Sequence, residues 1–230
     1  MRKLLTTILI FSLYVGTYAQ MEREEETSTK YLTNVPVTIN PNAINITGSA
    51  YENDAFVLGN VFRNEKLIAT NVALRYNALR DEFEVKPDLT TPDTAAKIMM
   101  RNPEIYVKIN SKVFIYADPK DGMSRPGYFL VLFEGENADL FKKISREFVE
   151  GMAATTSLTR DIPSTYKEKE GYFLFDKKTN SFKEFLNSKS AKFALFNEKK
   201  KELKNYSKNE NLNINRESSL IKLVEYYNTL

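Results

Sequence analysis

Residues 56–85 read FVLGNVFRNEKLIATNVALRYNALRDEFEV, and this stretch decides the fold class. Apolar and aromatic residues recur at period two on both sides of Arg63-Asn64-Glu65, which predicts two strands joined by a hairpin turn. The second strand would present Val72, Leu74 and Tyr76 on one face. The chain would then reverse at residues 77–81 and return through Phe83 and Val85. These features indicate the start of an antiparallel β-meander.

The same alternation continues on the C-terminal side. Residues 105–109 and 113–116 predict another hairpin, and residues 128–133 (YFLVLF) are apolar on both faces, which is typical of a central, doubly covered strand. Residues 88–103 are rich in Pro and Thr and predict a longer connection, with a short helix or strand at 95–100. Residues 145–166 are interpreted as a joint between subregions. A last hairpin would pair residues 172–175 with 182–185.

After residue 187 the pattern becomes helical. One apolar stripe consists of Phe193, Phe196, Leu203 and Tyr206, and a second consists of Leu220, Leu223, Val224 and Tyr227. Two amphipathic helices are therefore predicted, the second capped by Asn215. Their stripes either cover one face of the sheet or bind a partner, so Leu220, Leu223, Val224 and Tyr227 are candidate partner-binding residues.

The N-terminus has the pattern of a secretory signal. Residues 1–3 are Met-Arg-Lys, residues 4–15 are mainly apolar, and Ala19 is the expected cleavage position. The apolar run is shorter than a membrane-spanning helix needs. The expected organisation is a signal peptide (1–19), an acidic flexible arm and lead-in (20–50), a β-rich domain (51–186) and a helical segment packed on it (187–230). The protein should be exported to the periplasm or the outer membrane, without being integral to the membrane.

The chain contains no histidine, cysteine or tryptophan. It therefore lacks the usual neutral-pH general base, the imidazole and thiolate metal ligands, and any disulfide. We expect no enzyme activity, no cofactor and no metal. The remaining enzyme alternative is a carboxylate-based hydrolase, for which Asp81 with Glu84 and Glu134 with Glu136 are the acidic pairs. Residues 164–167 also fit the pattern S-x-x-K, without the partner motifs of Ser-Lys enzymes.

Charge argues against a nucleic-acid partner. The chain has 33 basic and 30 acidic residues, so 31 basic residues remain once Arg2 and Lys3 are removed with the signal. The basic residues gather locally at Lys199, Lys200, Lys201 and Lys204, which form either a solvated helix face or a site for anionic lipid or acidic polysaccharide.

Asp93-Thr94-Ala95 resembles an O-glycosylation sequon of Gram-negative envelope proteins, which makes Thr94 a candidate modification site.

Three stretches together resemble an uncharacterised family of small secreted envelope proteins of gliding-type Gram-negative bacteria. They are residues 51–61 (YENDAFVLGNV), residues 74–85 (LRYNALRDEFEV) and a C-terminal segment that contains LVEYYN. The resemblance implies an extracytoplasmic protein without known catalysis, and it implies no site residues.

The sequence thus predicts an α+β protein, in which an antiparallel sheet forms a curved sheet, sandwich or half-barrel and two C-terminal helices follow. The predicted function is a non-enzymatic binding protein or accessory subunit of an envelope protein assembly, with an outer-membrane or periplasmic protein as partner. The alternative is a carrier of a lipid or other apolar ligand. A carrier should contain a continuous apolar cavity under the helices, whereas a subunit should have a filled core and an exposed apolar patch or a bare sheet edge.

Overall fold

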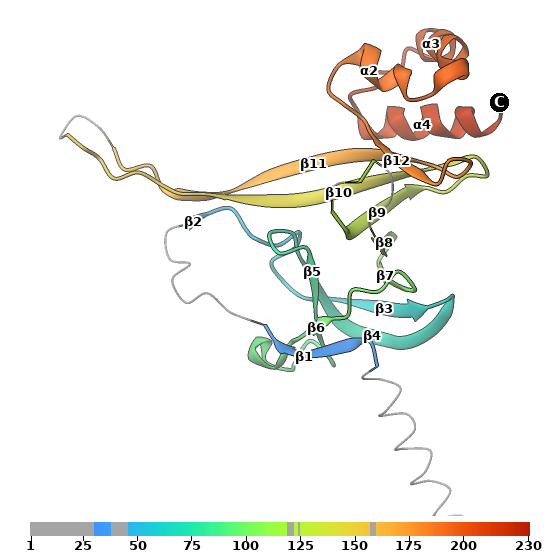
Figure 1. Cartoon of the computed structure of the whole chain (residues 1–230). Coiled ribbons are helices and arrows are strands. Elements are labelled where there is room, and N and C mark those ends of the chain that lie inside the picture. The colour runs from blue at the N-terminus through green and yellow to red at the C-terminus, as the bar shows by residue number, and fades with distance from the viewer. Residues whose placement is uncertain (1–29, 38–45, 119–121, 124, 157–159) are drawn as a thin grey trace, which may run out of the picture.

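The computed structural model describes residues 30–37, 46–118, 122–123, 125–156 and 160–230. Within these ranges twelve strands form one sheet, and the helices lie together at the C-terminal end of the chain, on one side of the sheet (Figure 1). The predicted α+β class, with an antiparallel sheet followed by helices, is confirmed. The predicted signal peptide lies outside the described residues.

The strands are β1 (Leu32–Pro36), β2 (Ile46–Thr47), β3 (Val57–Arg63), β4 (Lys66–Asn77), β5 (Glu82–Lys86), β6 (Lys97–Met99), β7 (Ile105–Ile109), β8 (Lys112–Ala117), β9 (Gly127–Phe133), β10 (Ala138–Val149), β11 (Ser164–Asp176) and β12 (Ser181–Glu184). The helices are α2 (Lys189–Ala194), α3 (Lys200–Asn209) and α4 (Glu217–Asn228), with short 3₁₀ turns η1 (Asp93–Ala95) and η2 (Asn197–Lys199). The predicted hairpins β3–β4, β4–β5, β7–β8 and β11–β12 are confirmed. The segment expected as a flexible lead-in contains β1 and β2.

The strands follow the order β1-β6-β5-β4-β3-β7-β8-β9-β10-β11-β12 across the sheet. Most neighbours in space are neighbours in sequence and pair antiparallel. The exception in direction is β2, which pairs parallel with β11 through Ile46 and Thr47. Turn residues adopt the left-handed conformation that tight reversals require, at Asn64, Asp81, Asn110 and Asn180. The turn chemistry read from the sequence thus determines where the meander reverses.

The first part of the sheet curls into a half-barrel around a core. Strands β4 and β5 are separated from β8 and β9 by β3 and β7 in the sheet, yet their side chains touch across the interior. The ring of Phe83 lies 5.3 Å from that of Phe114 and 5.0 Å from that of Tyr128. Tyr76 packs against the same two rings. Burial of these aromatic residues is what holds the curl closed.

A hydrogen-bonded junction fastens the β4–β5 turn to the facing strands. The Asp81 carboxylate accepts from the Tyr76 hydroxyl at 2.7 Å and from the Tyr128 backbone N–H at 3.1 Å. Its other oxygen lies 2.6 Å from the Lys143 ammonium. Burial and the nearby Asp81 charge raise the pKa of Tyr76, so the phenol remains a hydrogen-bond donor.

The helices cover the same face of the sheet beyond the half-barrel, and α4 lies on β9 and β10. Leu140 and Leu174 of the sheet form one buried cluster with Phe193, Leu203 and residues of α4. The predicted first helix is divided into α2 and α3, because the chain turns at Asn197, where φ is +45°. The predicted cap at Asn215 is wrong: Arg216 precedes α4, and the Asn215 side chain instead accepts a hydrogen bond from Lys192.

The opposite face of β9–β12 carries an aromatic cluster. Its rings are Phe129, Phe141, Phe173, Phe175 and Phe182. Gly122 and Met123, which precede β9, pack beside this cluster. Gly122 has φ +82°, and a Cβ there would overlap the Phe182 carbonyl oxygen, so the close approach depends on glycine. The strand pair β9–β10 is therefore covered on both faces, as the YFLVLF sequence indicates.

The prediction of a joint between subregions at residues 145–166 is wrong for the part of this segment that the structure describes. Strand β10 continues through Val149 and β11 begins at Ser164, so the two form one long hairpin. Its outer end projects well beyond the body of the molecule (Figure 1). We name the described residues 147–156 and 160–166 the arm.

Candidate functional site

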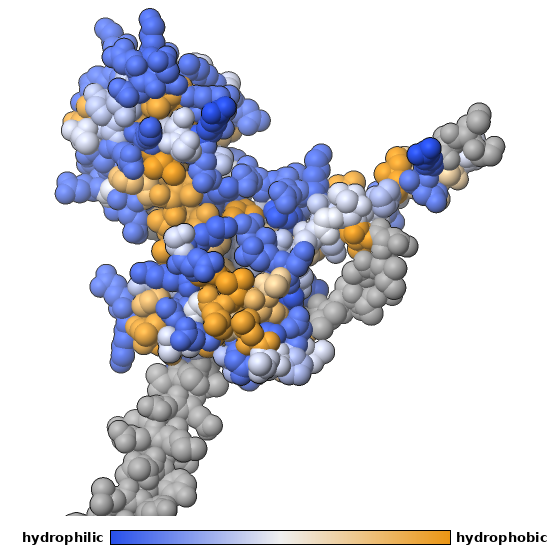
Figure 2. All heavy atoms as spheres, turned by 180° about the vertical axis from the view of Figure 1, so that it is seen from behind, coloured by the Kyte–Doolittle hydropathy of each residue, from blue (hydrophilic) through white to orange (hydrophobic). Residues whose placement is uncertain are grey.

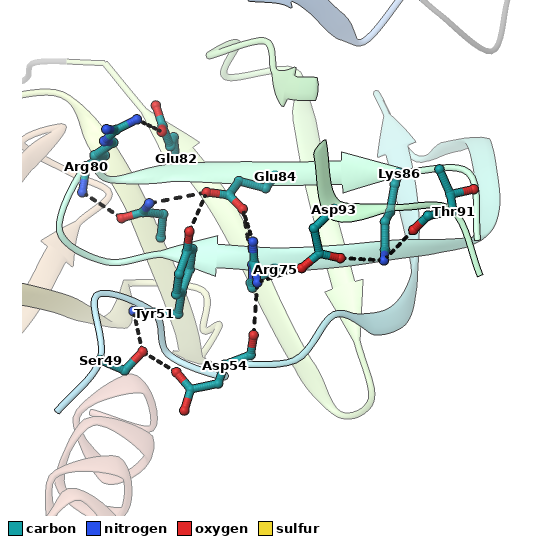
Figure 3. A network of polar contacts seen from close by, with 11 residues as sticks. Ser49, Tyr51, Asp54, Arg75, Arg80, Glu82, Glu84, Lys86, Thr91 and Asp93 are labelled. Carbon is teal, nitrogen blue, oxygen red and sulfur yellow. Dashed lines mark hydrogen bonds and ion pairs between the residues drawn. The ribbon is translucent and has the colours of Figure 1, made fainter. Parts of the chain in front are cut away.

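The RYNALRDEFEV motif forms a buried polar network on the outer face of β4 and β5 (Figure 3). Arg75 and Glu84 are paired across the two strands, and the guanidinium donates to the carboxylate at 2.7 Å and 3.1 Å. Glu84 is wholly buried, and its second oxygen accepts from Tyr51 and Asn77. Burial and the Glu84 charge raise the pKa of Tyr51 to about 12, so this hydroxyl also stays protonated.

Two aromatic rings enclose the Arg75 guanidinium. Its central carbon lies 4.1 Å from the ring centre of Tyr51 and 4.2 Å from that of Phe56. A cation held between rings and paired with a buried carboxylate has no room for a ligand. We conclude that the RYNALRDEFEV motif has a structural role.

The network extends to the connection before β6. Lys86 is buried, and its ammonium donates to the Asp93 carboxylate at 2.8 Å and to the Thr91 carbonyl at 2.7 Å. Asp93 also lies 3.4 Å from Arg75. Thr94, the candidate glycosylation site, is exposed beside this pair on η1, and its modification stays a prediction.

Asp93 gives a testable pH dependence. The hydrogen bond from Lys86 holds the pKa of Asp93 below its ordinary value. A carboxylate whose pKa is lower in the folded than in the unfolded state stabilises the protein at pH values above its unfolded-state pKa. This contribution is lost as the pH falls through the folded-state pKa. We expect the stability difference between wild type and Asp93→Asn to be small, because the carboxylate is half exposed, and to shrink below about pH 4. Urea unfolding of both proteins at about pH 6 and about pH 2.5 measures this stability difference. If the difference is the same at both pH values, the stabilising role of the Asp93 carboxylate is contradicted.

The carboxylate pairs proposed for a hydrolase are used otherwise or are exposed. Glu84 is enclosed by Arg75, and Asp81 is occupied by Tyr76, Tyr128 and Lys143. The remaining pair, Glu134 and Glu136, lies exposed near the β9–β10 turn.

The S-x-x-K pattern has no catalytic geometry. Ser164 and Lys167 lie on strand β11, where residues three positions apart point to opposite faces. The Ser164 hydroxyl instead accepts from the Gly151 backbone N–H at 3.0 Å. A lysine on the other face of a strand cannot serve as the base for this hydroxyl.

The candidate partner-binding stripe of α4 is buried within the chain itself. Leu220, Leu223 and Val224 have no exposed surface, and the Tyr227 ring packs 5.0 Å from that of Phe196. The structure therefore corrects the partner-binding assignment. The stripe covers the sheet because an isolated helix of this length is marginal in water and gains its stability from this packing.

The lysine cluster divides between two surfaces. Lys204 lines an open pocket of about 700 Å³ beside α2 and α3, together with Lys189 and Lys208. Lys199 lies 3.5 Å from Glu202, one turn along the same segment. Lys200 and Lys201 are not among the residues that line the pocket. Anion binding by the cluster stays a prediction.

The arm carries an exposed apolar surface that the sequence analysis missed. Its large apolar side chains are Phe148, Val149, Met152 and Ile162, which are 46 %, 44 %, 66 % and 57 % exposed. Figure 2 shows apolar side chains along this projection, away from the body. Large apolar residues are usually buried, and exposed clusters of them mark interaction surfaces. Four such residues on a thin projection therefore indicate a binding surface.

The arm is held in shape by its own backbone and by charges at its base. Met152 and Ile162 exchange two backbone hydrogen bonds of 2.9 Å and 2.8 Å beyond the end of the strands. Phe148 lies opposite Tyr166, with ring centres 5.6 Å apart. Nearer the body, Arg146 pairs with Glu168 at 2.9 Å. The arm thus presents apolar groups on an ordered hairpin.

Among the described residues, no helix has both the length and the apolar character needed to cross a bilayer. In the same part of the chain, no three His, Cys, Asp or Glu side chains gather in a group that could hold a metal ion. Comparison with known proteins found no match to a protein-family model, a curated protein or a solved structure.

Proposed function

We propose that this chain is a non-enzymatic binding protein, an accessory subunit of an extracytoplasmic protein assembly, and that the arm inserts into its protein partner. The observation that carries the proposal is the exposure of Phe148, Val149, Met152 and Ile162 on a hairpin that projects from a well-packed body. A partner with an apolar groove would bury these side chains. The export signal read at residues 1–19 supports the location.

The packing of the helices favours a subunit over a lipid carrier. A carrier requires space between the helices and the sheet, whereas Leu220, Leu223 and Val224 fill that space and are completely buried. An apolar cleft of about 410 Å³ does occur, but it is lined by residues of β1, β4, β5 and β6, on the far side of the half-barrel from the helices. Its described lining contains no phenylalanine and no residue of α2, α3 or α4.

The edge of β11 next to the arm favours binding to a different protein over self-association. Strand β11 pairs with β2 at Ser164 and Thr165 and with β12 from Phe173 onward. The edge between them carries the alternating charges of residues 167–170 (KEKE). Charged edge residues oppose pairing with further strands, which leaves the apolar end as the binding surface.

The experiment replaces the two most exposed apolar residues of the arm. We expect the double variant Met152→Ser/Ile162→Ser to keep the unfolding midpoint of the wild type, because both side chains are exposed. It should recover at least about tenfold less partner when the tagged protein is purified from its native envelope in mild detergent, because each lost apolar contact weakens the complex. Mass spectrometry of proteins and lipids identifies what co-purifies.

A matched control separates the arm from general surface hydrophobicity. Leu89 and Leu186 are 51 % and 58 % exposed and lie outside the arm, so Leu89→Ser/Leu186→Ser removes a similar apolar surface. The control should retain a stoichiometric partner protein. The proposal would be contradicted if the arm variant recovered as much partner protein as the wild type does. It would also be contradicted if the wild-type chain ran alone in gentle extracts. A lone chain with bound lipid would favour the carrier.

A further inference from the structure

A second surface lies at the base of the arm and shares Glu147 and Phe148 with it, but not Met152 or Ile162. It is a half-open cleft of about 1020 Å³ between the β4–β5 turn, the described residues 122–123 and 125–126, and strands β10 and β11. This volume is at the upper end of the range for small-molecule sites, so the cleft has room for a ligand of several rings.

The cleft concentrates the positive charge of the protein. Its basic lining residues are Arg80, Arg101, Arg125, Lys143, Arg146 and Lys169, and its acidic ones are Asp81, Glu147 and Glu184. The lining therefore has an excess of three basic residues, whereas the chain without Arg2 and Lys3 has 31 basic and 30 acidic residues. The cleft is thus more basic than the rest of the exported chain, which favours an anion here.

Two of these cations are held by structural ion pairs. Arg146 lies 2.9 Å from Glu168 and 3.7 Å from Glu52, and Lys169 pairs with Glu147. They fix the base of the hairpin. Neither is a first choice for binding a ligand, because a new anion would have to displace the carboxylate already present.

Among the described residues, the other four cations form ion pairs with two carboxylates. Arg80 and Arg101 approach the same residue, Glu82, at 3.7 Å and 3.9 Å. Lys143 pairs with Asp81, and Arg125 is exposed at the rim. Burial lowers the pKa of Lys143, and the positive charges of Arg101 and Arg125 lower it further, although Asp81 opposes them. Mutual repulsion of this kind is relieved when an anion binds.

The side chains of the cleft indicate the kind of anion. Three of the four cations are arginines, whose planar guanidinium groups bind carboxylates in a bidentate manner. The Ser145 hydroxyl donates to the Lys169 carbonyl at 3.2 Å, which leaves its oxygen as an acceptor for a sugar hydroxyl. Phe173 and the half-exposed Phe148 add ring surface against which the C–H face of a sugar can pack. A single inorganic anion would leave most of the cleft empty.

We propose that this cleft binds an acidic oligosaccharide, whose carboxylates are held by Arg80, Arg101 and Arg125 beside Lys143. The ligand is recognised by its regularly spaced negative charges on a carbohydrate ring. The cleft does not include the exposed apolar residues Met152 and Ile162, so this binding and the partner binding proposed for the arm can fail separately.

The test uses labelled oligogalacturonate and oligomannuronate, with a neutral maltooligosaccharide for comparison. We expect at least one acidic oligosaccharide to bind saturably to the full chain, with affinity that falls as salt is raised, and the neutral one not to bind. Arg80→Gln/Arg125→Gln should raise the Kd about tenfold or more, because two charge-assisted contacts are lost. The Arg80 side chain is 42 % exposed and Arg125 is exposed, so the unfolding midpoint should remain close to that of the wild type.

The control removes the same charge from the other basic surface. Lys201→Gln/Lys204→Gln should change the Kd by less than about twofold, because these exposed lysines lie on α3 and outside the cleft. A larger loss in this variant than in the arginine variant would move the site to the lysine cluster and overturn the proposal. Absence of saturable binding to both acidic oligosaccharides, or binding only to inorganic phosphate or phosphatidylglycerol vesicles, would overturn it as well.

Discussion

Glu84→Ala is expected to lower the free energy of unfolding by about 3–5 kcal/mol, because it leaves the Arg75 guanidinium buried without its carboxylate. Glu84 has no exposed surface, and Arg75 is 8 % exposed. The substitution also removes the acceptor used by Tyr51 and Asn77. Urea or thermal unfolding of the purified chain measures the loss.

Two further variants separate the ion pair from the cavity that the substitution creates. Arg75→Met/Glu84→Leu removes both charges and keeps the volume, so it should cost less than Glu84→Ala alone. Glu104→Ala removes an exposed carboxylate and should change stability by less than about 0.5 kcal/mol. If Glu84→Ala were as mild as Glu104→Ala, the network would not be structural.

Leu223→Ala is expected to cost about 2–5 kcal/mol, because it opens a cavity where α4 meets the sheet. Leu223 is completely buried in the cluster that Leu140 and Leu174 share with the helices. The adjacent Lys222 is exposed, so Lys222→Ala should change stability by less than about 0.5 kcal/mol. A docking role for this stripe makes the opposite prediction: Leu223→Ala would leave stability intact and abolish partner binding.

Strand positions were predictable because a half-buried sheet leaves a period of two in the sequence and a tight reversal leaves Asn or Asp. Both signals are strong from Phe56 to Val85, and the structure confirms the hairpins there. The first helix was less predictable. The spacing of Phe193, Phe196 and Leu203 fits one helical face, but the left-handed Asn197 turns the chain within it. A local backbone choice at one residue leaves little trace in hydrophobic periodicity.

The candidate sites depend on contacts between residues far apart in sequence, which periodicity does not report. Arg75 and Glu84 occupy the polar positions of an alternating strand pattern, where charged residues normally face solvent, so the sequence alone does not indicate that this pair is buried. The arm was missed because Gly151 and Pro163 are typical of turns and linkers, so the segment was interpreted as a connection between subregions. The cleft brings Arg80 and Arg125 beside β10 only through the curl of the sheet.

The pairing of β2 with β11 has a consequence for the order in which the chain folds. Strands β3 to β6 and β7 to β12 pair largely with their neighbours in sequence, so each run closes only short loops and should form early. The β2–β11 ladder joins Ile46 to Ser164, about half the chain away, through two residue pairs. We expect it to form last and to open first, so amide hydrogens of Ile46 and Thr47 should exchange with solvent before those of the meander.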